Sequence, residues 1–251
     1  MLQGCMEAGV TPVLAQMISD ADFTTRERAS RALSIAASDA IGLDFILTQD
    51  VVPDILKGAG DPTVEVRTNT YKCMYNLTRV PAGINTVVEA GGPQLLVKAF
   101  AEEKPSCQVH MLGTVQNLVK TQRGLAEASF YKAVKVCISL LRSPDEAVVV
   151  QAARTLGFIC FSDKEKDEAI AEGGVPTLCE ILGADVSSSA VRNAVSSALM
   201  SITSADEGKR QMGSCGGIEV VMSTLLGCTD RIILVNTLKL ISNCAVFPSS
   251  R

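Results

Sequence analysis

Apolar residues follow a helical spacing along most of the chain, and the segment Val64–Leu77 shows this pattern most clearly. Its apolar side chains stand at positions 66, 71, 73, 74 and 77, with polar residues between them. These positions share one side of a helix, whereas a half-buried strand would alternate apolar and polar residues. The turn signal Asp61-Pro62 stands just before the segment. The pattern predicts one long helix over Val64–Arg79.

The same pattern returns along the whole chain with a nearly constant period. Gly42, Gly83, Gly124 and Gly208 are separated by 41, 41 and 84 residues, and the last interval is two periods. Apolar segments, several of them opened by a Gly-Gly pair, return at matching intervals and begin at residues 6, 48, 89, 127, 171 and 214. A period of about 40–47 residues along a whole chain is typical of a helical solenoid.

Each repeat divides into three predicted helices. In the third repeat, a short helix over Ile84–Ala90 precedes Gly91-Gly92, and a second helix over Pro93–Ala101 follows the pair. A phosphate-binding loop is the alternative, but such a loop follows a strand and usually contains Gly-Lys-Ser/Thr. We therefore expect the glycine to end one helix and to turn the chain with a positive φ, which glycine adopts without a steric penalty.

The composition limits the kinds of core and surface that the chain can build. Hydrophobic residues make up 47% of the 251 residues, but aromatic residues make up only 4%, and there is no Trp. A core of Leu, Ile, Val, Ala and Met favours the packing of helices on helices. The net charge of −4 argues against a nucleic-acid surface, which needs a clustered basic excess.

The cysteines and the absence of a long apolar run bear on the compartment. The chain has nine cysteines and no C-x-x-C pair, so we expect free and mostly buried thiols in a reducing compartment. The sequence shows no signal peptide and no apolar run of ~18 residues. These features predict a soluble intracellular chain without a membrane contact.

One pair of side chains invites a chemical interpretation. The only histidine, His110, stands three residues after Cys107. A structural zinc needs four ligands, and the sequence has no second pair of this kind. We therefore predict no metal site, no cofactor, no small-molecule substrate and no catalytic residue.

With these features in place, the chain resembles the armadillo-repeat family. The resemblance is carried by Glu172–Leu182 (EGGVPTLCEIL) and Ser188–Thr203 (SSAVRNAVSSALMSIT). It implies an all-α fold, a right-handed α-α superhelix of about six three-helix repeats that form one domain over residues 1–251. The repeats are expected at residues 1–37, 38–79, 80–120, 121–162, 163–204 and 205–251.

Three segments are similar, more narrowly, to the armadillo-repeat proteins of the ciliary radial spoke. They are Asp61–Gly83, with its Arg-x-Asn, Tyr-Lys and Val-Pro-x-Gly features, Ile202–Lys209 and Asn236–Ser242. This resemblance implies a non-enzymatic structural subunit of the radial spoke in the axoneme of motile cilia or flagella. Its partners would be other radial spoke subunits. The alternative is a general cytosolic armadillo adaptor or chaperone that binds an extended peptide in its concave groove.

In the armadillo family the third helices line that groove, so the resemblance places the binding site on them. The expected protein-binding residues are Lys72, Asn76, Asn117, Ser197, Ser201, Lys239 and Asn243. The same count places Ser34 and Cys160 at the last turns of their helices, and Ser30, Gly113 and Leu156 one turn earlier. Lys72 and Lys239 are the only charged residues in this set, so we expect a mildly polar groove.

Two further expectations concern specificity and packing. Without a Trp, the groove offers no aromatic platform for a basic localisation peptide, because lysine stems stack on such rings. Arg67 and Arg192 stand near the starts of their third helices. The family resemblance implies an inter-repeat structural role for both, through bonds to carbonyl or acidic groups of the preceding repeat.

Overall fold

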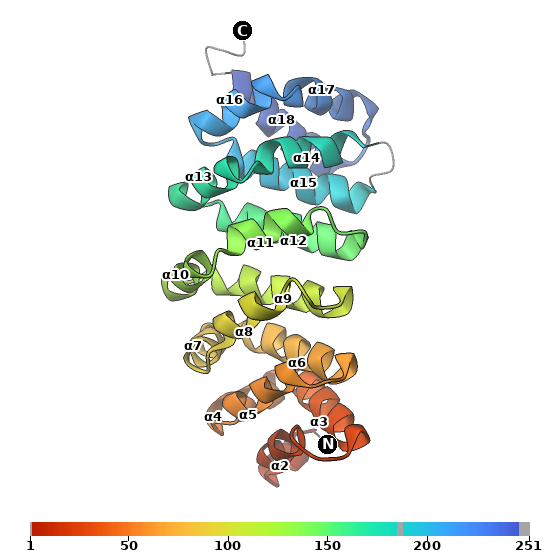
Figure 1. Cartoon of the computed structure of the whole chain (residues 1–251), viewed down its shortest axis with the longest axis vertical. Coiled ribbons are helices and arrows are strands. Elements are labelled where there is room, and N and C mark those ends of the chain that lie inside the picture. Colours follow the sequence, from red (N-terminus) through yellow and green to blue (C-terminus); the bar gives the residue numbers. More distant parts are fainter. Residues whose placement is uncertain (1, 185–187, 246–251) are drawn as a thin grey trace. The chain divides into compact units, whose positions relative to one another are not determined.

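The computed structural model describes residues 2–184 and 188–245, and every regular element in these ranges is helical. The predicted all-α fold is therefore confirmed for these residues. The chain divides into two compact units, Met1–Tyr131 and Lys132–Arg251 (Figure 1). Parts of three predicted repeats, at residue 1, residues 185–187 and residues 246–251, lie outside the described residues.

The first unit holds three three-helix repeats and the first helix of a fourth. Its helices are α1 (Leu2–Glu7), α2 (Val10–Met17), α3 (Phe23–Ala36), α4 (Ala40–Thr48), α5 (Val52–Lys57), α6 (Val64–Leu77), α7 (Pro81–Glu89), α8 (Gly92–Ala99), α9 (Pro105–Leu118) and α10 (Gln122–Phe130). A 3-10 turn, Gly58–Gly60, follows α5. The three predicted helices of the sequence correspond to α6, α7 and α8, with ends that differ by up to three residues.

The second unit continues the same order of helices. They are α11 (Ala133–Leu140), α12 (Glu146–Ile159), α13 (Asp163–Ala171), α14 (Gly174–Gly183), α15 (Ser189–Ile202), α16 (Asp206–Ser214), α17 (Gly217–Gly227) and α18 (Arg231–Ala245). Two full repeats, α13–α15 and α16–α18, follow the pair α11 and α12.

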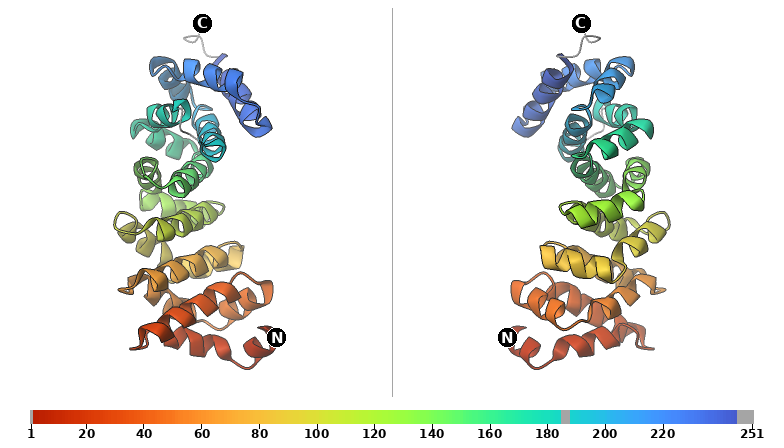
Figure 2. Two further views of the ribbon diagram at one scale, coloured as in Figure 1. Left: turned by 90° about the vertical axis from the view of Figure 1, so that its right-hand side faces the viewer. Right: turned by 90° about the vertical axis from the view of Figure 1, so that its left-hand side faces the viewer.

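Within each unit, the third helices of successive repeats lie side by side. In the first unit α3 packs on α6 and α6 packs on α9, and in the second unit α12 packs on α15 and α15 packs on α18 (Figure 2). The second helices cover one side of this layer, as α2 does on α3 and α14 does on α15. The core between the layers is aliphatic, with Leu33, Met74 and Leu156 at most 1% exposed. Each third helix therefore keeps one side toward solvent.

A left-handed residue joins the first and second helices in every repeat. The φ angle is +78° at Gly91, so the turn predicted for the glycine pair is confirmed at its first residue. The equivalent glycines at residues 9, 173 and 216 have φ angles of +78°, +75° and +73°. Asp50 and Lys132 take the same place in the two repeats that lack the glycine, with φ angles of +56° and +57°.

A second set of glycines lets each first helix approach the helix before it. A Cβ atom at Gly83 would collide with the carbonyl oxygen of Leu77, the last residue of α6. A Cβ at Gly208 would stand 2.6 Å from the carbonyl oxygen of Ile202, at the end of α15. Only glycine lacks this atom, so the 41-residue glycine period records a backbone contact between successive repeats.

Candidate protein-binding face

The predicted binding residues should lie on the exposed side of the third helices. The first residue of each helix fixes which positions are equivalent from one repeat to the next. The helices α3, α6, α9 and α12 each have 14 residues and start 41 residues apart. The ninth residues of the six third helices are Arg31, Lys72, Gly113, Arg154, Ser197 and Lys239. The thirteenth residues are Ile35, Asn76, Asn117, Phe158, Ser201 and Asn243. We call these positions, with the helix ends beside them, the third-helix face of each unit.

This register corrects four of the residues expected on the face. Ser30, Ser34, Leu156 and Cys160 are buried, with exposed fractions of 2% or less. The exposed residues are instead Arg31, Ile35, Arg154 and Phe158. A shift of one or two residues rotates a side chain by about 100–200° around a helix, which moves it from solvent into the packed side. The face is also more basic than expected, because Arg31 and Arg154 share the position of Lys72 and Lys239.

The predicted lysines and serines lie on the third-helix faces as helical counting requires. Lys72 on α6 and Lys239 on α18 are exposed. Ser197 and Ser201 on α15 are half-buried, and the Ser201 hydroxyl donates to the carbonyl oxygen of Ser197 at 3.3 Å. Ligand contact by these four residues stays a prediction.

The three predicted asparagines use their amide N–H groups to bond to the preceding repeat. Asn76 Nδ2 donates to the carbonyl oxygen of Ser34 at 3.0 Å. Asn117 Nδ2 lies 3.4 Å from the carbonyl oxygen of Tyr75, and Asn243 Nδ2 lies 3.4 Å from that of Met200. Each asparagine therefore ties two neighbouring third helices together. Asn76 and Asn117 are buried, and the amide oxygen of Asn117 also accepts from Lys120 Nζ at 2.8 Å, so Asn243 is the only one of the three that is partly exposed.

An aromatic residue not expected on the face, Tyr75 on α6, packs against α9. The ring of Tyr75 faces Gly113, where a Cβ atom would stand 2.8 Å from the ring. The rings of Tyr75 and His110 have centroids 6.2 Å apart. Burial, and secondly the Lys72 ammonium, lowers the pKa of His110, so this side chain is neutral at pH 7. A glycine inside a long helix, one repeat after a tyrosine, is the signal for this contact.

The two predicted structural arginines have different surroundings. Arg67 Nε donates to Glu103 Oε1 at 2.8 Å, and its Nη1 donates to the carbonyl oxygen of Asp61 at 2.9 Å. Glu103 belongs to the following repeat, so the expected bridge to the preceding repeat is wrong for Arg67. The Nε atom of Arg192 is buried and has no hydrogen-bond partner among the described residues. An inter-repeat role for Arg192 stays a prediction.

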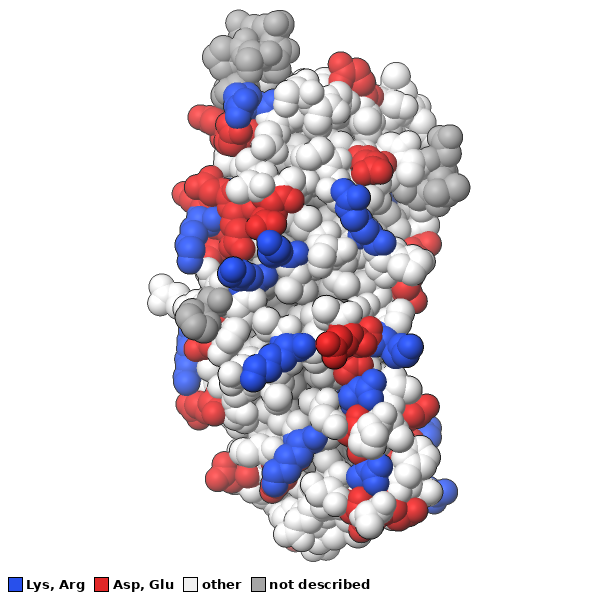
Figure 3. All heavy atoms as spheres, in the orientation of Figure 1, with Lys and Arg blue, Asp and Glu red and all other residues white. Residues whose placement is uncertain are grey.

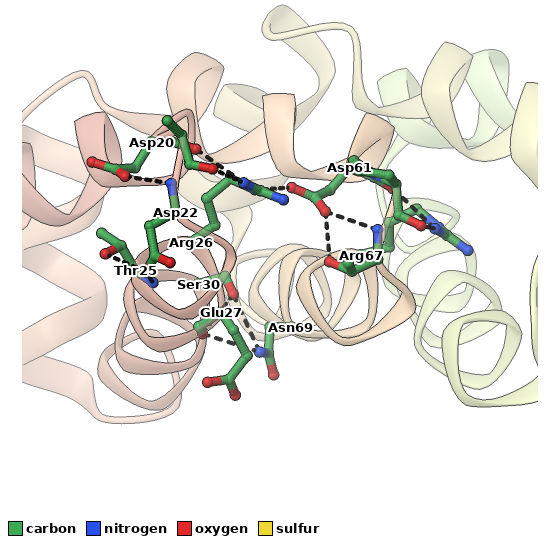
Figure 4. A network of polar contacts seen from close by, with 12 residues as sticks. Asp20, Asp22, Thr25, Arg26, Glu27, Ser30, Asp61, Arg67 and Asn69 are labelled. Atoms are coloured by element: carbon green, nitrogen blue, oxygen red, sulfur yellow. Dashed lines mark hydrogen bonds and ion pairs between the residues drawn. The ribbon is translucent and has the colours of Figure 1, made fainter.

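The same device occurs one repeat earlier and forms a connected network (Figure 4). Arg26 Nε donates to Asp61 Oδ2 at 2.6 Å, and the arginine also bonds carbonyl oxygens of Asp20 and Ala21. Thr63 donates to the other oxygen of Asp61. Burial alone raises the pKa of Asp61, but the bonds from Arg26 and Thr63 together bring it below its usual value. These arginines fasten repeats together and are not free for a ligand.

The third-helix face of the second unit carries an exposed aromatic pair. Phe158 on α12 is 41% exposed and Phe161, just after the helix, is 75% exposed. Their ring centroids lie 6.2 Å apart in an edge-to-face arrangement. Arg154 lies one turn before Phe158 and is exposed. Exposed aromatic rings beside an arginine are the residue types that dominate the energy of protein interfaces.

The described residues contain no arrangement that points to bond-making chemistry. No group of three or more His, Cys, Asp or Glu side chains among them could hold a metal ion. Burial raises the pKa of the Cys107 thiol to about 11, so the thiol beside His110 is not ionised at pH 7. None of the described helices is long and apolar enough to cross a membrane.

Comparison with known proteins reveals a likeness in structure and none in sequence profile. No known family profile matches the chain. No curated protein matches it either. An engineered protein solved by the Northeast Structural Genomics Consortium has a TM-score of 0.90 and 26% identity, and the match covers 99% of this chain and 61% of the other.

Designed armadillo repeat proteins are also among the similar structures. One has a TM-score of 0.84 and 18% identity, with 93% of this chain and 99% of the other covered. Another, solved in complex with the peptide (KR)4, has a TM-score of 0.83 and 18% identity, with 93% and 98% covered. The chain therefore has an armadillo-like repeat fold, as the sequence patterns predicted.

Proposed function

We propose that this chain is a non-enzymatic scaffold that binds other proteins on its third-helix faces. The observation that carries the proposal is the exposed pair Phe158 and Phe161. Apolar rings on a well-packed helix cost free energy in water, and a partner that covers them recovers about 25 cal/mol for each Å² buried. Phe158 lies within α12, so its backbone is already ordered before a partner binds.

The aromatic pair gives a direct test of the scaffold function. Phe161→Ala removes the more exposed ring without opening a core cavity, and we expect a loss of partner binding. Leu226→Ala is the matched control, because Leu226 on α17 is 83% exposed and lies off the third-helix face. The assay is the quantitative recovery of partners from ciliated-cell extract by each purified variant. Equal recovery by wild type and Phe161→Ala would reject the pair as a binding anchor.

We further propose that the partners are subunits of the radial spoke and that the chain resides in the axoneme of motile cilia or flagella. The support is the resemblance of Asp61–Gly83, Ile202–Lys209 and Asn236–Ser242 to the armadillo-repeat proteins of the spoke. The chain should then co-purify with axonemes and should be missing from axonemes that lack spokes. Its retention in spokeless axonemes would contradict this assignment.

A general cytosolic adaptor or chaperone is the second candidate. The designed armadillo protein in complex with the peptide (KR)4 favours it, because a protein of similar fold binds a peptide without any ciliary context. Abundant expression in a cell type without cilia would support this alternative and count against the spoke. Both candidates use the same face and involve no chemical step.

A further inference from the structure

The third-helix face of the first unit carries a concentration of positive charge that the net charge of the chain conceals. Arg31 and Lys72 occupy the ninth position of α3 and α6, and both are exposed. Arg79 and Lys120 follow the ends of α6 and α9 at matching places, and both are exposed. All four belong to a chain with a net charge of −4.

Three of these cations have no carboxylate partner. The side chains of Arg31, Lys72 and Arg79 take part in no ion pair or hydrogen bond with any described residue. Lys120 Nζ donates to the amide oxygen of Asn117 at 2.8 Å, so this fourth cation is not counted with the other three.

Four other cations of the first unit differ in this respect. Arg26, Lys57, Arg67 and Arg123 each contact a carboxylate within 3.0 Å. On the side of the molecule shown in Figure 3, positive and negative side chains are likewise interspersed. Four of the seven other cations of this unit are therefore paired with a carboxylate, whereas Arg31, Lys72 and Arg79 are not.

The acidic residues nearest to these cations form no ion pair with them. Glu27 and Glu65 stand in the first halves of α3 and α6, before Arg31 and Lys72. Asp39 caps α4, where its carboxylate accepts from the backbone N–H groups of Ile41 and Gly42. The second halves of α3, α6 and α9 carry no Asp or Glu.

A hollow lies next to one of these cations. It has a volume of about 230 Å³ between the ends of α3 and α6, and Ser38, Asp39, Asn76 and Arg79 are among its lining residues. Asn76 is only 5% exposed, but it lines this hollow; its Nδ2 donates to the carbonyl oxygen of Ser34, which leaves the amide oxygen as the group that can accept from a backbone N–H. The face thus combines unpaired cations with an acceptor suited to a peptide chain.

We propose that the third-helix face of the first unit binds an extended acidic segment of a partner protein, with its carboxylates on Arg31, Lys72 and Arg79. This inference rests on the scaffold function proposed above and specifies the chemistry of the partner. Packed helices lie about 8–10 Å apart, and an extended chain advances about 3.3 Å per residue. One repeat therefore corresponds to about three residues, so carboxylates on Arg31 and Lys72, which are one repeat apart, stand about three positions apart in the segment.

A nucleic acid is the other polyanion to consider, and it fits less well. Single strands bind where aromatic side chains stack on successive bases along a basic groove. Here Tyr75 faces Gly113 and the neighbouring His110, which leaves no series of open rings between the cations. The test therefore compares the binding of an acidic peptide with the binding of a single-stranded RNA.

The test measures fluorescence anisotropy with the full chain and four labelled probes of equal length. The probes are a peptide with Glu at every third position, its Gln counterpart, a Lys/Arg peptide and a single-stranded oligouridine. We expect the Glu peptide to bind best, and its affinity to fall with added salt, since the attraction is between exposed charges. Equal binding of the Gln peptide, or tighter binding of the Lys/Arg peptide or the RNA, would overturn the proposal.

Charge reversal locates the site. Lys72→Glu combined with Arg79→Glu should weaken the Glu peptide by about tenfold, because exposed pairs contribute a few tenths to about 1 kcal/mol each and repulsion replaces attraction. Lys57→Glu combined with Lys98→Glu makes the same change of charge on α5 and α8, and it should alter affinity less than about twofold. Equal losses in both double variants would refute this location.

The outcome is separable from that of the scaffold proposal. Circular dichroism confirms that each variant keeps its helices, so loss of binding is not loss of folding. Partner recovery that depends on Phe161 while the Glu peptide fails to bind would overturn the acidic segment and leave the scaffold in place.

Discussion

The left-handed turn between the first and second helices allows a quantitative test of the repeat architecture. Lys132 adopts a φ of +57° at a place where four other repeats use glycine. For a residue with a Cβ atom this conformation costs about 1–2 kcal/mol. Lys132→Gly removes that cost, but it adds unfolded-chain entropy worth about 0.4–1 kcal/mol. The net expectation is a gain of about 1 kcal/mol in the free energy of unfolding.

The reciprocal change isolates the backbone contribution. Gly91 has a φ of +78°, and a Cβ atom added there would have no heavy atom within 4 Å. Gly91→Ala should therefore destabilise through backbone conformation alone, by about 1 kcal/mol. Asp50→Gly serves as an intermediate case, because Asp tolerates the left-handed region better than Lys. We expect its gain to be smaller than that of Lys132→Gly.

Thermal unfolding followed by circular dichroism provides the measurement. For a chain of this size, about 1 kcal/mol corresponds to a shift in Tm of about 3 °C. Urea midpoints with unchanged slopes would establish that the variants differ in stability and not in the surface exposed on unfolding. A decrease or no change in Tm for Lys132→Gly would refute the argument that this position requires a left-handed residue.

Two further predictions concern the buried polar network and the thiols. Asp61→Asn should lower the free energy of unfolding at pH 7, because it leaves the partly buried Arg26 guanidinium without its counter-charge. The pKa of Asp61 is lower in the folded state than in the unfolded chain, where it is about 3.9. The ionised carboxylate therefore adds fully to the stability above about pH 3.9, and this stabilisation is lost as the pH falls through the pKa of the folded state. Urea titrations from pH 7 to pH 3 should show the gap between wild type and variant closing, and a constant gap would contradict the ionic role. In the native chain, a thiol reagent should modify the exposed Cys5 and Cys215 rapidly, whereas Cys73, fully buried with its pKa raised to about 12 by burial, should react only on unfolding. Rapid native labelling of Cys73 would contradict the packing of α6 on α3.

The repeat architecture could be predicted from the sequence because its physical causes recur at fixed intervals. Gly83 and its equivalents mark the close approach of a first helix to the preceding third helix, and Gly91 marks a left-handed turn. The positions of these glycines along the sequence therefore reveal the repeat period. Asp50 and Lys132 adopt the same turn without a glycine. Their conformation is imposed by the helices on either side, and no local preference of Lys signals it.

The binding face was harder to place because a helix converts small errors of register into large rotations. The spacing of small polar residues led to Ser34 and Cys160, which are buried. The exposed residues are Ile35 and Phe158, one and two positions away. The helix starts were needed to fix this phase. The partner of Arg67 could not be predicted from the sequence either. Glu103 lies 36 residues later, in a loop whose course depends on the packing of α8 and α9.

The most direct test of the central claim is site-specific photo-crosslinking in ciliated cells. A photoreactive residue replaces Lys72 or Phe161 on the third-helix faces, or Lys98 on the second helix α8 as a control. The account predicts crosslinks to a discrete partner protein from Lys72 and Phe161 and none to that protein from Lys98. Crosslinks to the same partner from Lys98 alone would contradict binding on the third-helix faces.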